Sequence, residues 1–187
     1  QTLPELLAYA KANPGKLSYG ATGAGSLPAL AMEALKARTG TSMTFVPYAS
    51  ASKIALDVMG GHLDIGVSGL PALIEHVKSG KVTGVGVMSK ERDIGAPDMP
   101  SAGATKELQA MDFWTGLLAP KGTPPDVVLR VNAAFADALK DEKIRARFKD
   151  YGVKISEPMT SAQFGNYVAK SNADWGAVVK QSNFKKN

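Results

Sequence analysis

A glycine-rich turn between a strand-like and a helix-like segment constrains this chain more than any other feature. The run LSYGATGAGS covers residues 17–26 and has glycines at positions 20, 23 and 25. The alanine-rich pattern of a helix follows from Leu27 to Arg38. Glycine lets a backbone approach a ligand closely, and a helix N-terminus adds unpaired N–H groups and the positive end of the helix dipole. The turn is therefore suited to hold a carboxylate or a phosphate without a charged side chain.

The spacing of these glycines separates the turn from two common nucleotide motifs. The order Gly20-x-x-Gly23-x-Gly25 is neither the dinucleotide fingerprint G-x-G-x-x-G nor the P-loop G-x-x-x-x-G-K-S/T. Three interpretations stay open at this point: a plain strand-to-helix turn, a site for a small anion and, least favoured, a nucleotide site.

Helix-like and strand-like segments alternate along the first half of the chain. We expect helices over residues 3–12, 26–38, 51–59 and 71–78, with strands over residues 16–19, 43–46, 63–67 and 82–88. Thr2 and Glu5 form a candidate capping box for the first helix. Regular alternation of helices with short apolar strands predicts a parallel sheet covered by helices on both faces.

The second half of the chain has a different pattern. Residues 89–101 carry charges and prolines without periodicity and are predicted to form a loop. The run DFWTGLLA over residues 112–119 is typical of a buried strand. Long helical patterns follow over residues 125–151, with a break near Lys140-Asp141, and over residues 161–181, where aromatic side chains at helical spacing are expected to pack in a core.

Polar, glycine-containing loops follow three successive predicted strands. They cover residues 19–26, 47–52 and 68–69. Because the carboxyl ends of parallel strands meet at one edge of a sheet, these loops should converge. Tyr48 would serve as a wall or a donor for a small polar ligand. Hydroxyl groups would come from the small side chains of these loops, which are Thr22, Ser26, Ser50, Ser52 and Ser68.

Catalytic motifs are scarce in the 187 residues. The absence of cysteine excludes thiol catalysis and disulfides, and the only histidines are His62 and His76. His62 and Asp64 at i, i+2 are more typical of a solvated loop than of a base with its orienting group, and neither metal-ligand spacing nor a nucleophile elbow is present. We expect no catalytic residue, metal or cofactor. A small hydrolase or transferase using Ser26 or Ser68, and a module that binds no small molecule, remain alternatives.

Charge and hydropathy restrict partners but leave the compartment open. The net charge of +5 lies mostly toward the C-terminal end, where basic residues alternate with acidic and apolar ones, so nucleic-acid binding is not expected. No apolar run approaches the length of a membrane span, and residues 1–16 lack the pattern of a signal peptide.

Several motifs together resemble the Bug-type solute receptors of tripartite tricarboxylate transporters. They are Y-G-x-x-G-x-G-S at 19–26, V-P-Y at 46–48, the glycine pair at 60–61 and A-P-x-G-T-P at 119–124, within a similarity that runs along essentially the whole chain. The resemblance implies a periplasmic protein of two lobes that closes over a carboxylate like a Venus flytrap and delivers it to membrane transporter subunits. It implies a type II periplasmic-binding-protein fold, with a three-layer α/β/α lobe around a mostly parallel sheet.

The resemblance also assigns domains. Residues 1–110 would form the second ligand-binding lobe, and residues 111–187 would form a crossover strand and the C-terminal helices of a first lobe that is incomplete here. Helices of an incomplete lobe expose an apolar face, so we expect dimerisation or aggregation.

The resemblance also implies which residues contact the ligand and which class of ligand the protein prefers. A ligand carboxylate would meet the glycine turn through the residues Gly20, Ala21, Thr22, Gly23, Gly25 and Ser26. The position of Ser68 is often aspartate in the family, where it can meet a ligand amine. Serine here implies a preference for unsubstituted mono-, di- or tricarboxylates over amino acids.

Overall fold

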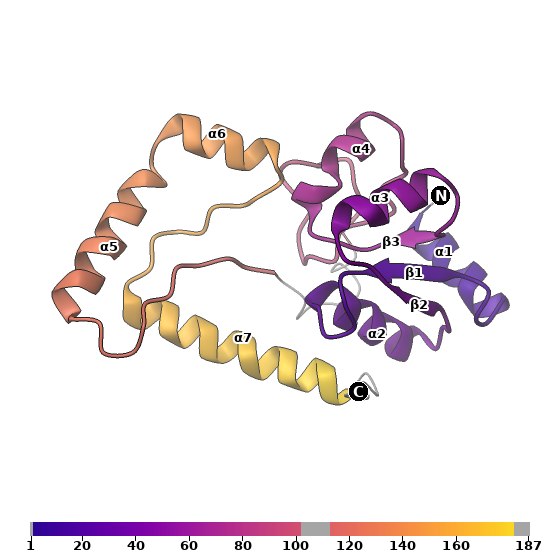
Figure 1. The fold of residues 1–187 in the computed structure, drawn as a ribbon, viewed down its shortest axis with the longest axis horizontal. Coiled ribbons are helices and arrows are strands. Elements are labelled where there is room, and N and C mark those ends of the chain that lie inside the picture. The colour runs from indigo at the N-terminus through magenta and orange to yellow at the C-terminus, as the bar shows by residue number, and fades with distance from the viewer. Residues whose placement is uncertain (1, 102–112, 182–187) are drawn as a thin grey trace.

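Residues 2–101 and 113–181 are described by the structure, a computed structural model. Residues 2–101 form an α/β unit and residues 113–181 form a C-terminal unit (Figure 1). The expected domain boundary at Ala110 and the first residue of the expected strand at 112–119 lie outside the described residues.

The α/β unit alternates helices and strands as predicted. Its elements are α1 (Leu3–Ala12), β1 (Ser18–Ala21), α2 (Leu27–Thr39), β2 (Thr44–Pro47), α3 (Ala51–Met59), β3 (Ile65–Gly66), the 3-10 turn η1 (Leu70–Ala72) and α4 (Ile74–Lys78). The strands form a parallel three-stranded sheet in the order β2-β1-β3. The expected strands at 16–19 and 43–46 are displaced by one or two residues, and the strand at 63–67 is reduced to two residues.

Helices cover both faces of the sheet because successive strand residues point to opposite sides. Tyr19 and its register partner Ile65 lie in the core cluster with Ala10 of α1 and Met32 of α2. On the opposite face of the sheet, the glycines that follow Tyr19 and Ile65 let α3 approach closely. A Cβ at Gly66 would lie 2.8 Å from Ile54 Cγ2 of α3. This three-layer arrangement agrees with the predicted α/β architecture.

Local signals explain where the helices begin and end. Thr2 and Glu5 form the expected capping box on α1, with Thr2 N donating to Glu5 Oε2 at 2.8 Å. Ser26 caps α2 by accepting from Ala29 N at 3.4 Å, and Gly40 ends the same helix in the left-handed conformation at φ +64°.

The C-terminal unit consists of α5 (Pro125–Ala138), α6 (Glu142–Asp150) and α7 (Ser161–Gln181). The expected break falls between α5 and α6, where Asp141 accepts from the amides of Lys143 and Ile144 and so begins α6. Helix α7 runs from the side of α5 back toward the α/β unit, and its C-terminal end lies beside α2 (Figure 1). Its Val178 is buried in the core cluster and its Trp175 packs against that cluster, so the expectation of core packing is confirmed for these residues.

The predictions of strands at residues 82–88 and 112–119 are wrong for the described residues. Residues 82–88 contain only an isolated bridge between Val87 and Ser101, and residues 113–119 contain no strand. A strand is stabilised by hydrogen bonds to a neighbour, and no described strand lies beside residues 113–119. Leu117 and Leu118 there are 57% and 76% exposed, which contradicts the expected burial.

Candidate functional site

The glycine turn joins β1 to α2 at the carboxyl edge of the sheet. Within it Gly23 N donates to Ala21 O at 3.0 Å and Ser26 N donates to Gly23 O at 3.2 Å, while Gly23 has a φ of +79°. Left-handed backbone at this point favours glycine. The turn is therefore held by its own backbone and by the Ser26 cap.

The turn presents backbone donors to solvent at the start of a 13-residue helix. Thr22, Ala24 and Gly25 are exposed, and within the described residues their amides donate to no protein acceptor. A Cβ at Gly25 would meet nothing within 4 Å, so the turn is open to an approaching ligand. Unpaired N–H groups together with a helix dipole can bind an anion.

Gly20 and Ala21 lie deeper than the rest of the predicted site, because both belong to β1 and are buried. Gly20 O accepts from Val67 N at 3.0 Å, and a Cβ at Gly20 would lie 2.6 Å from Leu63 Cδ2 and 2.8 Å from Tyr48 Cε2. Close packing against Leu63 and Tyr48 therefore favours glycine at position 20, whether or not this residue contacts a ligand.

Tyr48 lies beside this strand, and its hydroxyl donates to Asp57 Oδ2 at 2.7 Å. This hydrogen bond raises the pKa of the Tyr48 phenol above its usual value. Asp57, on α3, was not among the predicted site residues, because its pairing with Tyr48 depends on how α3 packs and has no signal in the sequence. Since the hydroxyl is used as a donor here, Tyr48 retains an oxygen that can accept.

Ser68 follows β3 and is half-buried. Its Oγ makes no hydrogen bond to a described residue, whereas the preceding Val67 N donates to Gly20 O at 3.0 Å. The three predicted loops lie at one edge of the sheet, because β1, β2 and β3 are parallel and end at Ala21, Pro47 and Gly66. Of the predicted site residues, Ser68 alone also lines the large cavity beside this unit.

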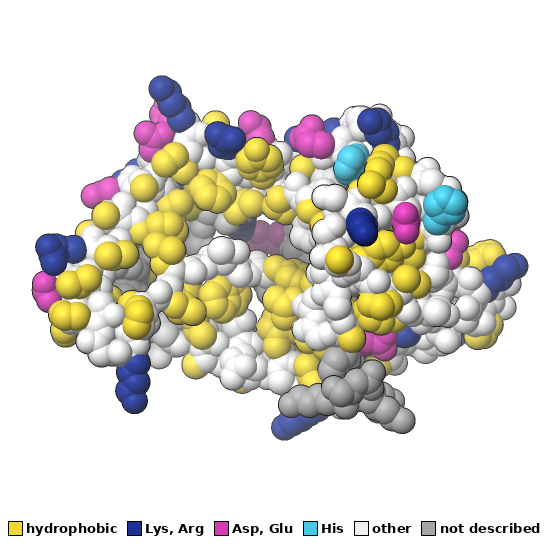
Figure 2. All heavy atoms as spheres, viewed as in Figure 1, with side chains coloured by type: hydrophobic (Ala, Val, Ile, Leu, Met, Phe, Trp, Pro, Cys, Tyr) yellow, Lys and Arg dark blue, Asp and Glu magenta, His cyan; other side chains and the backbone are white. Residues whose placement is uncertain are grey.

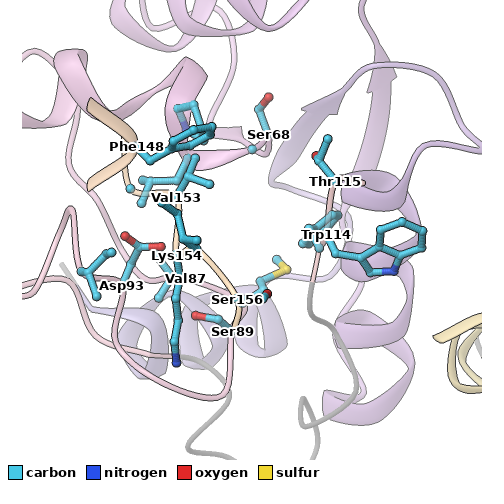
Figure 3. A pocket seen from close by; sticks show the side chains of 18 of the residues that line it. Ser68, Val87, Ser89, Asp93, Trp114, Thr115, Phe148, Val153, Lys154 and Ser156 are labelled. Atoms are coloured by element: carbon cyan, nitrogen blue, oxygen red, sulfur yellow. The ribbon is translucent and has the colours of Figure 1, made fainter. Parts of the chain in front are cut away.

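That cavity, called the hollow below, has a volume of about 2040 Å³ and lies between the α/β unit and the C-terminal unit. Hydrophobic side chains surround its opening (Figure 2). Its size exceeds the roughly 300–1,000 Å³ of small-molecule pockets. Polar side chains reach it at Ser68, Ser89, Lys154 and Ser156, with Thr115 across from Ser68 (Figure 3). The hollow is thus adjacent to the glycine turn through Ser68 but separate from it.

The structure offers little support for the catalytic alternative. Asp64 Oδ2 accepts from Ser18 N at 2.8 Å and from Ser18 Oγ at 2.7 Å, bonds that lower the pKa of the Asp64 carboxyl. No hydrogen bond joins Asp64 to His62, or a histidine to Ser26 or Ser68, among the described residues. The described residues contain no group of three or more His, Cys, Asp or Glu side chains that could hold a metal ion.

None of the described helices has the length and apolar character needed to cross a lipid bilayer.

Comparison with known proteins gives one family. A family model described as "Tripartite tricarboxylate transporter family receptor" matches residues 1–184. Protein BugT of Bordetella pertussis is 27% identical over 190 residues, which cover 98% of this chain and 56% of BugT. The chain therefore spans little more than half the length of this curated relative.

Two solved structures have the same fold. One, described as a periplasmic transporter, is 31% identical with a TM-score of 0.86, and the match covers 98% of this chain and 61% of the other. MatC from Rhodopseudomonas palustris with bound malate is 25% identical with a TM-score of 0.80, covering 96% and 62%. These matches confirm the predicted fold class.

Proposed function

This chain belongs to the tripartite tricarboxylate transporter receptor family, and we propose that it captures a small organic carboxylate in the periplasm for delivery to a membrane transporter. The observation that carries the proposal is the glycine turn at the start of α2, where the exposed amides of Thr22, Ala24 and Gly25 have no protein acceptor among the described residues. A carboxylate supplies two acceptor oxygens and a negative charge, and both match this end of the helix.

The ligand contacts follow from this placement. The amides of the turn receive the carboxylate, with Gly23, Ser26 and Thr22 at its rim, Gly20 and Ala21 beneath it, and Tyr48 and Ser68 at the neighbouring strand ends. This arrangement can bind an anion without a lysine or arginine, because the charge on the ligand is stabilised by backbone dipoles. The malate bound to MatC, a 25% identical relative, supports a dicarboxylate as the ligand class.

Ser68 sets the preference between carboxylates and amino acids. A hydroxyl accepts or donates a hydrogen bond but carries no charge to balance a ligand ammonium group. The protein therefore prefers unsubstituted carboxylates, whereas Ser68→Asp should favour their amino analogues. Comparing succinate with aspartate on both proteins measures this preference, because succinate is aspartate without its amino group, and tighter binding of aspartate by the unchanged protein would contradict it.

The division of the chain into two lobes is part of the same proposal. Residues 1–110 form one ligand-binding lobe, and residues 111–187 contribute a crossover segment and helices to another lobe. The apolar lining of the hollow supports this division, because α5 turns Val131 and Phe135 toward the hollow while leaving them 50% and 41% exposed. Closure of the two lobes over the ligand is the state that the transporter subunits recognise.

Thermal unfolding with a ligand panel tests the function. A ligand that binds only the native state raises the unfolding midpoint, and the stabilisation grows with the logarithm of the ratio of its concentration to its Kd. We expect a concentration-dependent rise with malate or another mono-, di- or tricarboxylate, and none with nucleotides. A shift with nucleotides alone, or no shift with any carboxylate, would contradict the proposal; turnover lost on Ser26→Ala or Ser68→Ala would favour the enzyme alternative.

A further inference from the structure

Three segments from distant parts of the chain meet around Gly152, just after α6. Gly152 is buried with a φ of +67°, and a Cβ there would lie 2.6 Å from Leu70 Cδ2 and 2.9 Å from Asp93 Oδ1. A Cβ at Gly95 would lie 2.4 Å from Gly152 Cα and 2.7 Å from Lys149 O. Neither glycine has room for a side chain, so the two backbones pack directly on each other.

Polar contacts reinforce the same junction. Lys78 Nζ of α4 donates to Asp150 O at 3.1 Å, and Lys154 Nζ pairs with Glu91 Oε2 at 3.0 Å. Pairing with Lys154 lowers the pKa of the Glu91 carboxyl. The first contact joins the α/β unit to the last residue of α6, and the second joins it to the segment that follows α6. The ion pair is exposed on both sides and adds little stability, so the glycine contact fixes the geometry.

A second, different attachment lies at the other end of the C-terminal unit. There α7 packs on α2, with Val178 2% exposed inside the core cluster. The unit is thus held by an apolar contact at α7 and by a backbone contact at the end of α6, and the hollow lies between them (Figures 1 and 2). Among the described residues, these two attachments lie on either side of the open space.

The backbone contact also reaches the candidate ligand site. Leu70, which packs against Gly152, comes two residues after Ser68. Ser68 and Asp93 line the same hollow (Figure 3). A displacement at Gly152 is therefore transmitted to the loop of Ser68 through one side chain and a short stretch of backbone.

We propose that the contact among Leu70, Gly95 and Gly152 is a pivot that sets the orientation of α5 and α6 against the sheet and couples it to the loop of Ser68. The coupling to ligand rests on the proposed function, whereas the orientation is a property of the protein without ligand. An added methyl group at Gly95 displaces the end of α6, because the opposing atoms belong to the backbone of Gly152 and Lys149 and cannot rotate away. At Gly152, whose φ is +67°, an added methyl group meets the side chains of Leu70 and Asp93 and strains the left-handed backbone.

Distance measurement between two spin labels tests the pivot. The sequence has no cysteine, so Lys53→Cys on α3 and Glu142→Cys on α6, both exposed, give a clean label pair. Gly95→Ala and Gly152→Ala should shift the distance between the labels. Gly122→Ala is the matched control for Gly152→Ala, because Gly122 has a φ of +88° but nothing within 4 Å of its Cβ. Leu70→Ala removes a pivot side chain without inserting an atom, and should broaden the distance distribution even if the glycine variants fail to fold.

The same labels, titrated with malate, test the coupling. In the unchanged protein malate should shift the distance, and the pivot variants should weaken malate binding between about twofold and thirtyfold while Gly122→Ala does not. Distances in Gly95→Ala and Leu70→Ala that match those of the unchanged protein would overturn the pivot. If malate and related carboxylates bind nowhere, the proposed function fails, but the ligand-free distances still decide the pivot.

Discussion

Tyr48 donates its hydroxyl proton to Asp57 Oδ2 across 2.7 Å and so ties the loop after β2 to α3. The ring of Tyr48 lies against Gly20, the first glycine of the motif, and Tyr48 N donates to Ala21 O at 3.0 Å. The pair therefore supports the strand from which the glycine turn begins.

Loss of this hydrogen bond should destabilise the fold. Tyr48→Phe and Asp57→Ala each remove one partner of this hydrogen bond, and each should lower the free energy of unfolding. The double variant should lose less than the sum, because both changes remove one interaction. Urea unfolding measures all three, with Tyr9→Phe as the control for loss of an exposed phenol. Strictly additive losses would contradict the pairing.

A methyl group at position 20 should overpack the sheet. Gly20→Ala would place a carbon 2.6 Å from Leu63 Cδ2 and 2.8 Å from the Tyr48 ring, and should cost roughly 1–3 kcal/mol. Gly25→Ala is the control, because its Cβ would meet nothing within 4 Å and its stability should stay close to that of the unchanged protein. Equal unfolding midpoints for Gly20→Ala and the unchanged protein would show that Tyr48 and Leu63 yield freely.

The cap of α2 should serve both stability and binding. Ser26→Ala removes the acceptor for Ala29 N and should lower stability by about 1 kcal/mol. Thr2→Ala removes a cap of the same kind from α1, away from the glycine turn, and should cost a similar amount. Calorimetric titration should find weaker carboxylate binding for Ser26→Ala alone; an equal loss of affinity in both variants would indicate an indirect effect of stability.

The bond between Ser18 and Asp64 should make stability depend on acid pH. The Ser18 hydroxyl, followed by the Ser18 N–H, lowers the pKa of the Asp64 carboxyl below its ordinary 3.8. The folded state then binds fewer protons than the unfolded state near this pH, so the stabilisation is complete above the ordinary pKa and is lost as pH falls through the lowered one.

Removing the Ser18 hydroxyl tests this pH dependence. Ser18→Ala should raise the pKa of Asp64, which a carboxyl-carbon NMR titration measures directly. Ser42→Ala, on an exposed hydroxyl that bonds no described residue, should leave that pKa unchanged. A titration curve that is the same for Ser18→Ala and the unchanged protein would contradict the assignment.

The apolar inner face of α5 should cause self-association. Val131 and Phe135 line the hollow and remain about half-exposed. Light scattering on a size-exclusion column should find dimers or larger species at high concentration, and Phe135→Ser should shift them toward the monomer. Leu56→Ser on α3, which is 62% exposed and outside the hollow, is the control and should change nothing. A monomer at every concentration would contradict self-association.

Local signals carried most of what the sequence predicted correctly. The capping box of Thr2 and Glu5 and the break near Lys140-Asp141 are each defined by residues within one helical turn. Such interactions depend on nearby residues alone, and the pattern that encodes them is visible without a structure.

Interactions between distant residues were beyond sequence reasoning. The apolar runs at 82–88 and 113–119 have the composition of strands, but strand pairing depends on a neighbour. Among the described residues the first run has only the isolated bridge from Val87 to Ser101, and the second has no neighbouring strand. For the site, the glycine turn was predictable because strand, turn and helix are consecutive. The partnership of Tyr48 with Asp57, and the meeting of Gly95 with Gly152, arise from packing and leave no local pattern.

The most direct test of the central claim is an amide NMR titration of the protein with malate. If the glycine turn holds the carboxylate, the amide signals of Thr22, Ala24 and Gly25 shift saturably together, because these donors gain an acceptor. The Gly15 amide, which already donates to Ser42 O at another left-handed glycine outside the hollow, is the internal control and stays in place. Saturable shifts elsewhere with the turn amides unmoved would contradict the account.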